Sequence, residues 1–332
     1  MASSLQNEVD LPFIDFSQFS FESEGLKNLQ NHPGVATVRE ACKEWGFFRI
    51  INTGIPNEVF QNLESVSHEL RAMPQEVKDR VITSNPIESY YRSSNKESFW
   101  FPSSPHSDSL LAFSHKIWPE KGNPKLCETI GAYTSGTADL QCKITIIILA
   151  SLGLDAETFY HSDFEKCTSY MRIHLYNSDG KLTKDEEALF AHTDPNCFTI
   201  LYQDNDGGLQ IKSNQGNCMD VKPLSNSLLV NIGELLKAWS NGRYRSVEHR
   251  VIYKGWTNRI SVVWTVEFPY DKEIWAPAEL VDQHHPRCFH PFTFSQVLEA
   301  SMNHGLSQKG NQTSIDSYAQ MSIALKKYEN LA

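Results

Sequence analysis

The chain has 332 residues, of which 40% are hydrophobic and 21% charged, a composition typical of a soluble globular protein with a substantial core. Its formal net charge of −10 argues against a nucleic acid or an anionic membrane surface as the main partner. The longest apolar run, Ile144–Ala150, is much shorter than the roughly 20 residues of a membrane-spanning helix. We therefore expect neither nucleic acid nor membrane as a partner.

The cysteines indicate a reducing compartment. All seven are scattered singly, and no Cys-x-x-Cys motif occurs. This usage predicts free thiols, so we expect a cytoplasmic protein. We also expect a monomer. The segment Met1–Asp10 carries two acids and no apolar core, unlike a secretory signal. Cys197 is expected to be a small buried hydrophobic residue and not a redox centre.

The first 125 residues predict a helix-rich N-terminal region. Apolar residues recur at helical spacing in two segments, and short apolar runs bounded by turn residues predict strands. In the first helix and the strand after it, Trp45, Phe47 and Phe48 are expected to pack in the core. The expected elements are a strand at Leu11–Phe16, a helix at Val35–Trp45, a strand at Phe47–Ile51 and a helix from Pro56 to Arg71.

Residues 84–125 are rich in Ser, Pro, Asn and aromatic residues and show weak periodicity. This pattern predicts a long connection, and long connections are often functional lids. The aromatic residues either line the mouth of a substrate pocket or pin the segment to the core, and the sequence leaves both interpretations open. These residues are Tyr90, Tyr91, Phe99, Trp100 and Phe101. A long helix is expected next, from Glu128 to Leu152.

Beyond this helix the pattern changes to short strands separated by turn signals such as Asn205–Gly208. Many short strands at this spacing are typical of a β-sandwich or barrel, whose inner face can carry ligands from several strands. We therefore expect a mainly β fold with flanking helices, in which residues 165–290 form the β region. No repeat or linker interrupts the chain, so residues 1–332 are expected to form one catalytic unit. The expected strands are Met171–Tyr176, Thr199–Tyr202, Gly208–Ile211, Met219–Val221, Ser227–Ile232, His249–Ile252 and Arg259–Phe268, with a helix–loop–helix tail from Phe292.

The pattern His-x-Asp occurs three times, at His106–Asp108, His161–Asp163 and His192–Asp194. The first lies in a Pro- and Ser-rich segment typical of a solvated turn, and the second suits a helix cap or loop. The third alone precedes strand-like residues, and in an extended segment its His and Asp side chains point the same way. With His249 it completes a two-histidine, one-carboxylate set, which binds Fe(II) and leaves coordination positions open. A zinc hydrolase would also suit these ligands, but no His-Glu-x-x-His motif accompanies them.

With these residues in view, the chain resembles the plant-type 2-oxoglutarate- and Fe(II)-dependent dioxygenases over nearly its whole length. Three further segments resemble a subgroup that includes auxin-oxidising and glucosinolate side-chain dioxygenases: Trp118–Glu120, Thr199–Gln203 and Ala276–Val281. The family motifs are Trp45–Phe48 with Gly54–Pro56, His192-x-Asp194, Gly207–Gln210, Asn231–Gly233, Asn241–Arg243, Ser246–Val251 and Arg259-x-Ser261.

The resemblance implies a double-stranded β-helix, or jelly-roll, core flanked by helices. It assigns Fe(II) to His192, Asp194 and His249, with ascorbate keeping the iron reduced. It also assigns the distal carboxylate of 2-oxoglutarate to Arg259 and Ser261, with a further contact from Tyr176. The family's Asn-x-Tyr stretch is His174-Leu175-Tyr176 here, so the Asn is replaced.

The activity that the resemblance implies is oxidation of a small plant metabolite, by hydroxylation, with O₂ and 2-oxoglutarate giving succinate and CO₂. Two alternatives stay open at this point. One is an oxidase of the same superfamily that does not use 2-oxoglutarate. The other is a non-catalytic small-molecule receptor on the same fold, although a receptor would tend to lose ligands and none is lost here.

Overall fold

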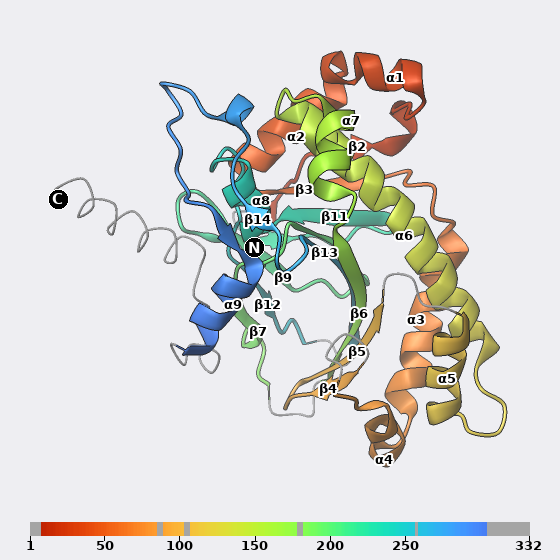
Figure 1. The fold of residues 1–332 in the computed structure, drawn as a ribbon. Helices are drawn as coiled ribbons and strands as arrows, with labels where there is room; N and C mark the ends of the chain where they lie inside the picture. Colours follow the sequence, from red (N-terminus) through yellow and green to blue (C-terminus); the bar gives the residue numbers. More distant parts are fainter. Residues whose placement is uncertain (1–7, 85–88, 103–106, 178–181, 256–257, 304–332) are drawn as a thin grey trace.

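The computed structural model describes residues 8–84, 89–102, 107–177, 182–255 and 258–303, and two β-sheets lie at its centre (Figure 1). The larger sheet has eight strands, in the order β2 (Phe13–Asp15), β3 (Phe47–Ile51), β11 (Ser227–Ile232), β8 (Phe198–Gln203), β13 (Asn258–Glu267), β6 (Thr168–Asn177), β5 (Lys96–Pro102) and β4 (Tyr90–Arg92). The smaller has five, in the order β1 (Glu8–Val9), β10 (Cys218–Val221), β9 (Leu209–Lys212), β12 (His249–Ile252) and β7 (Glu187–His192). The mainly β fold with a jelly-roll core is confirmed.

Helices cover the outer face of the larger sheet (Figure 1). The long helix α6 (Pro124–Ser151) begins where the Asn123 side chain accepts a hydrogen bond from the Leu126 amide at 3.0 Å. It packs against α2 (Pro33–Glu44), α3 (Asn57–Ala72) and α5 (Ser107–Ile117). The indole of Trp264 on β13 donates to Gln141 of α6 at 2.8 Å, which ties this helix to the sheet.

Shorter elements complete the described chain. The helices are α1 (Ser23–Asn28), α4 (Gln75–Lys78), α7 (Ala156–Phe159), the π-helical turn Tyr160–Phe164, α8 (Glu234–Trp239) and α9 (Phe294–Asn303). Single 3₁₀ turns occur at Phe16–Gln18, Leu29–Asn31, Asp79–Val81 and Ala278–Leu280, and a small hairpin pairs β14 (Glu273–Ile274) with β15 (Phe292–Thr293).

Strand alternation separates the two faces of the larger sheet. Successive side chains of a strand point to opposite faces, so each residue of β6 and β13 faces either the helices or the smaller sheet. The helix-facing positions are apolar and buried: Ile173, Leu175, Val262 and Trp264. The positions facing the smaller sheet are largely polar: Arg172, His174, Tyr176, Arg259 and Ser261. The inner face of this sheet therefore carries the chemistry.

The periodicity of the sequence located most elements to within a few residues. The helices expected at Val35–Trp45, Pro56–Arg71 and Glu128–Leu152 are α2, α3 and α6, and every strand expected between 171 and 268 is present. Phe47 and Phe48 are buried, and Trp45 is partly buried against the core. For the tail, α9 confirms the first helix, while the second lies outside the described residues.

The expectation of a long connection at residues 84–125 is wrong. The segment contains β4, β5 and α5, and β5 pairs along its whole length with β6 in the larger sheet. Successive side chains of β5 point to opposite faces, and Phe99 and Phe101 share the face toward the helices, where they are fully buried beside Phe113. The high Ser and Asn content obscured this alternation. Of the aromatic residues in the segment, Tyr91 lines the cavity described below.

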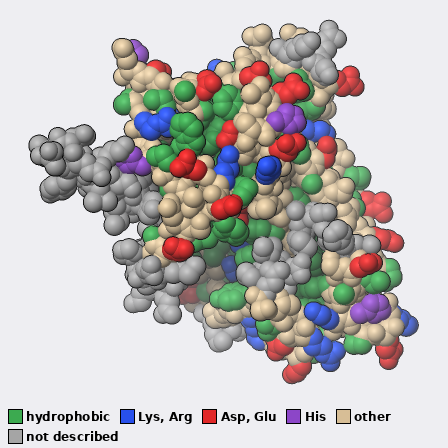
Figure 2. Space-filling view, in the orientation of Figure 1, with side chains coloured by type: hydrophobic (Ala, Val, Ile, Leu, Met, Phe, Trp, Pro, Cys, Tyr) green, Lys and Arg blue, Asp and Glu red, His purple; other side chains and the backbone are tan. Residues whose placement is uncertain are grey.

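On the face drawn in Figure 2, the described acidic and basic side chains are interspersed among hydrophobic ones. No helix in the described part of the chain has the length and apolar character that a membrane crossing requires.

Because Phe99 packs in the core, Phe99→Ala should lower the free energy of unfolding by about 3–5 kcal/mol. Leu111→Ala on α5 is the control, since Leu111 is 47% exposed and its truncation leaves no buried cavity. Urea denaturation followed by circular dichroism measures both variants. Equal stability of Phe99→Ala and wild type would show that this ring is not a core residue.

Candidate metal centre

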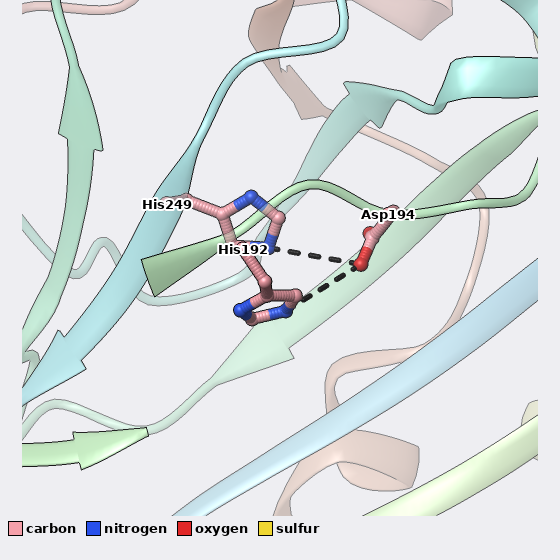
Figure 3. Close-up of side chains that lie close together, drawn as sticks. All are labelled: His192, Asp194 and His249. Carbon is pink, nitrogen blue, oxygen red and sulfur yellow. Dashed lines mark ion pairs between the residues drawn. The ribbon is translucent and has the colours of Figure 1, made fainter. Parts of the chain in front are cut away.

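The third His-x-Asp pair meets His249 at one point between the sheets (Figure 3). His192 ends β7 and His249 begins β12, and the two residues are paired across these antiparallel strands. Asp194 follows β7 by two residues. Its Oδ1 atom lies 3.7 Å from His192 Nε2 and 3.8 Å from His249 Nε2. The three ligand atoms lie within 4.8 Å of one another, and this is the only such group of His, Cys, Asp or Glu side chains among the described residues.

Both imidazoles are held in the state that binds a metal. His192 Nδ1 lies 2.8 Å from the carbonyl oxygen of Phe190, and His249 Nδ1 lies 3.1 Å from that of Val247. A ring nitrogen facing a carbonyl carries the hydrogen, so each Nε2 presents its lone pair to the centre. Burial, together with the neighbouring His249, lowers the pKa of His192 to about 4. His192 is therefore neutral near pH 7 and able to act as a ligand.

The carboxylate of Asp194 divides its two oxygens between protein and site. Oδ2 accepts hydrogen bonds from Thr199 Oγ1 at 2.6 Å and from Asn231 Nδ2 at 2.9 Å. Oδ1 accepts none from the described residues and faces the two Nε2 atoms. Burial raises the pKa of Asp194, but the neighbouring histidines and these two hydrogen bonds outweigh it and hold the pKa at about 2. Two imidazole nitrogens and one uncommitted carboxylate oxygen fit a divalent metal.

The backbone after Asp194 is fixed by the start of α8. The amide of Glu234 donates to the Asp194 carbonyl and that of Gly233 to the Cys197 carbonyl, both at 2.8 Å. A Cβ at Gly233 would lie 2.1 Å from the carbonyl oxygen of Asn196, so only glycine fits this approach. The motif Asn231–Gly233 therefore has two roles at the site. The Asn231 amide bonds Asp194, and Gly233 allows the close approach to the Asn196 backbone. Cys197 is fully buried, as expected of a small hydrophobic residue.

A second polar group on the same inner face surrounds Arg259 of β13. The guanidinium is 1% exposed and lies 4.7 Å from the centre of the Tyr176 ring. Its hydrogen bonds go to neutral acceptors: the Gly207 carbonyl at 2.6 Å, Gln203 Oε1 at 3.2 Å and Ser261 Oγ at 3.4 Å. No carboxylate of the described residues forms an ion pair with it, and Gln203 Nε2 is buried without a partner. An anionic ligand would satisfy this buried charge.

Both groups open into one cavity of about 370 Å³ between the sheets. Its lining includes all six residues predicted for the site: His192, Asp194, His249, Arg259, Ser261 and Tyr176. His174, which replaces the family's Asn, also lines it and contacts Ser98 Oγ through Nδ1 at 2.7 Å. Sequence reasoning missed Thr199 and Asn231 as partners of Asp194. Their positions on the inner faces of β8 and β11 were the available signal.

The other His-x-Asp pairs do not form a comparable centre. His106 lies outside the described residues. His161 is exposed on the π-helical turn, with Nδ1 3.2 Å from Glu165 Oε1. Asp163 instead contacts Lys272 Nζ at 2.9 Å. The larger hollow beside His161, about 470 Å³ between α6 and the N-terminal segment, holds no group of three metal-ligating side chains among the described residues.

Arg243 of the Asn241–Arg243 motif and the adjacent Tyr244 make contacts within the fold. Tyr244 is buried and its hydroxyl bonds that of Ser151 at 2.6 Å, while Arg243 donates to the Leu280 carbonyl at 3.2 Å. Fold and site together thus define a jelly-roll protein with a candidate two-histidine, one-carboxylate metal centre beside a buried arginine.

Comparison with known proteins agrees with this class. The model of the 2OG-Fe(II) oxygenase superfamily matches residues 167–267. The N-terminal model described as non-haem dioxygenase in morphine synthesis matches residues 11–120. A gibberellin 20-oxidase-like protein of Arabidopsis thaliana is 34% identical over 82% of this chain and 85% of its own length. A probable 2-oxoglutarate-dependent dioxygenase of the same plant, AOP1.2, is 30% identical over 87% of this chain and 89% of its own length.

Solved structures show the same relationship. The dioxygenase for auxin oxidation from rice is 25% identical, with a TM-score of 0.77 over 92% of this chain and 99% of its own. The corresponding Arabidopsis enzyme, solved as a complex with 2-oxoglutarate, is 26% identical. Its TM-score is 0.70 over 84% of this chain and 100% of its own. The chain belongs to the 2OG-Fe(II) oxygenase superfamily and is a 2-oxoglutarate- and Fe(II)-dependent dioxygenase. The resemblance to the auxin-oxidising subgroup is confirmed.

Because Thr199 orients Asp194, Thr199→Val should weaken divalent-metal binding roughly 10- to 100-fold while the fold persists. The control is Thr134→Val, the same change at a buried hydroxyl that donates to Ile130 within α6 at 2.8 Å. Anaerobic equilibrium dialysis with Fe(II) measures the affinity of both variants. Equal affinities would show that this hydrogen bond does not support the centre.

Proposed function

We propose that His192, Asp194 and His249 hold Fe(II) and that Arg259 and Ser261 bind the distal carboxylate of 2-oxoglutarate, with Tyr176 beside them. The observation that carries this proposal is the convergence of two Nε2 atoms on the free oxygen of Asp194. The buried guanidinium in the same cavity supports the co-substrate half. An arginine presents paired donors that match a carboxylate, and the Ser261 hydroxyl adds a third.

Bound Fe(II) activates dioxygen, and 2-oxoglutarate supplies two electrons as it is converted to succinate and CO₂. The protein's residues do the positioning. Thr199 and Asn231 aim one oxygen of Asp194 at the centre, and the backbone carbonyls fix both imidazole rings. Gln203 and the Gly207 carbonyl hold the Arg259 side chain in place before any ligand arrives. Such preorganisation fixes the co-substrate relative to the metal centre.

The substrate is a small plant metabolite, and hydroxylation is the reaction that the resemblance favours. The names of the relatives support a plant metabolite, since they include proteins described as gibberellin and auxin dioxygenases. The single cavity that contains both the metal ligands and Arg259 is large enough for a small molecule beside the co-substrate. A cytoplasmic location, a monomeric state, a role in specialised metabolism and a need for ascorbate complete the proposal.

The whole ligand set should be needed for iron binding. His192→Ala, Asp194→Ala and His249→Ala should each lose Fe(II) and all turnover while circular dichroism stays unchanged. His161→Ala is the matched control, because it removes the histidine of another His-x-Asp pair from an exposed position. Iron content and succinate release are measured together. Loss of iron in His161→Ala with retention in His192→Ala would contradict the choice of pair.

Arg259 separates a 2-oxoglutarate enzyme from an oxidase of the same superfamily. Truncation by Arg259→Ala leaves a buried carboxylate unpaired, so 2-oxoglutarate affinity should fall by about 2–5 kcal/mol, roughly 30-fold to several thousand-fold. Arg259→Lys keeps the positive charge but loses the paired donors of the guanidinium, so its affinity for 2-oxoglutarate should lie between those of wild type and Arg259→Ala. Anaerobic calorimetry with Fe(II) measures both, and iron content should not change. Wild-type affinity in Arg259→Ala would remove the co-substrate assignment and favour the oxidase.

A further inference from the structure

Two basic side chains in the cavity take no part in the site proposed above. Lys96 begins β5 and Arg172 lies on β6, and both line the cavity. Neither side chain forms an ion pair with a carboxylate of the described residues, and Lys96 also makes no side-chain hydrogen bond there. Partly buried cations that no carboxylate contacts directly are costly, so their presence indicates that an anion occupies this part of the cavity.

The Arg172 guanidinium is held in one position. It lies 4.8 Å from the ring centre of Trp100 and 5.3 Å from that of Tyr170, and these two rings stack at 5.5 Å. One terminal nitrogen donates to Thr265 Oγ1 at 2.9 Å. The Nε atom is buried and has no partner. A guanidinium fixed by two aromatic rings, with donors left over, is prepared to bind a carboxylate.

Arg172 and Arg259 mark different parts of the cavity. Arg172 is paired with Trp100 on one side and Val263 on the other, whereas Arg259 is paired with Tyr176. Tyr176 lies four residues beyond Arg172 on β6, which separates the two backbone positions by about 13 Å at roughly 3.3 Å per residue. The anion at Arg172 is therefore a different carboxylate from the one assigned to Arg259.

The charges of the cavity favour an anionic second ligand. Its charged lining residues are Lys96, Arg172 and Arg259 against Asp194 and Glu267. His174 adds no charge, because burial and the neighbouring cations hold its pKa well below the usual 6.5. With Fe(II) and doubly charged 2-oxoglutarate bound, one positive charge remains. A single further carboxylate neutralises it.

Part of the remaining lining is apolar. Leu201 and Val263 lie in the row of Arg172 across the larger sheet, and Leu209 belongs to the smaller sheet. Phe190 and Tyr91 are 46% and 58% exposed, so their rings stand where the cavity meets solvent. This surface fits an apolar body attached to the carboxylate.

We propose that the oxidised substrate is an apolar small molecule with one carboxylate, and that Arg172 determines specificity by binding this carboxylate. Lys96 adds to the positive field but makes no directional contact. This inference rests on the proposed function, because it requires 2-oxoglutarate to occupy the Arg259 end. It assigns Arg172 a role in substrate selection and none in holding metal or co-substrate.

Matched acid and amide pairs test the proposal by anaerobic calorimetry on enzyme loaded with Fe(II) and 2-oxoglutarate. The probes are phenylacetate, indole-3-acetate and hexanoate, each with its primary amide. Wild type should bind at least one acid ten times or more tightly than its amide. Arg172→Gln should weaken acid binding about 10- to 100-fold, leave amide binding unchanged and keep 2-oxoglutarate affinity within about threefold. The acid affinity of Arg172→Lys should lie between those of wild type and Arg172→Gln, because lysine keeps the charge but lacks the paired donors of a guanidinium.

Two comparisons keep the outcomes distinct. Arg92→Gln is the control variant, since Arg92 is an exposed arginine at the edge of the same sheet and contacts Gln75. It should behave as wild type with every probe. Equal affinity for acids and amides, no binding of any acid, or a loss in Arg172→Gln that falls on 2-oxoglutarate alone would each overturn the inference. Failure of wild type to bind 2-oxoglutarate would instead overturn the proposed function and the inference with it.

Discussion

Strand alternation in the eight-stranded sheet is the constraint on which the rest of the structure depends. A residue of β5, β6 or β13 faces either α6 and its neighbours or the cavity, with no intermediate position. The outer positions bury apolar side chains against helices, and this packing supplies most of the core. The inner positions are then free to carry charged and polar groups, because the smaller sheet and the cavity cover them. A shift of one residue in register would exchange Arg259 with Ile260 and remove the site.

The inner face carries groups whose bonding capacity the protein leaves partly unused. Asp194 keeps one oxygen without a donor, and Arg259 keeps a buried guanidinium without a carboxylate. Unsatisfied buried groups destabilise a fold unless a ligand completes them. Ligand binding should therefore stabilise this protein by linkage as well as start its chemistry. The same reasoning extends along β6 to Arg172, whose Nε is unpartnered.

The fold and the His-x-Asp pair of the candidate site could be predicted from sequence because both depend on local patterns. Period-two alternation and turn residues located the strands, and the spacing of His192 and Asp194 placed both ligands on one side of an extended segment. Long-range pairing was harder to foresee. Thr199 and Asn231 meet Asp194 only because β8 and β11 are neighbours, which no local pattern records. The aromatic segment containing Phe99 was misread because its many Ser and Asn residues are typical of a loop, whereas β5 pairs with β6 along its whole length.

The central claim is that the metal centre and Arg259 hold the two ends of one 2-oxoglutarate molecule in one cavity. Anaerobic calorimetry of wild type with 2-oxoglutarate, in the presence and absence of Fe(II), tests it most directly. The account predicts one molecule bound per chain, clearly tighter with Fe(II) than without. It also predicts a much smaller effect of Fe(II) on succinate, which lacks the oxo group that completes chelation. Equal affinity for 2-oxoglutarate with and without the metal would contradict the account.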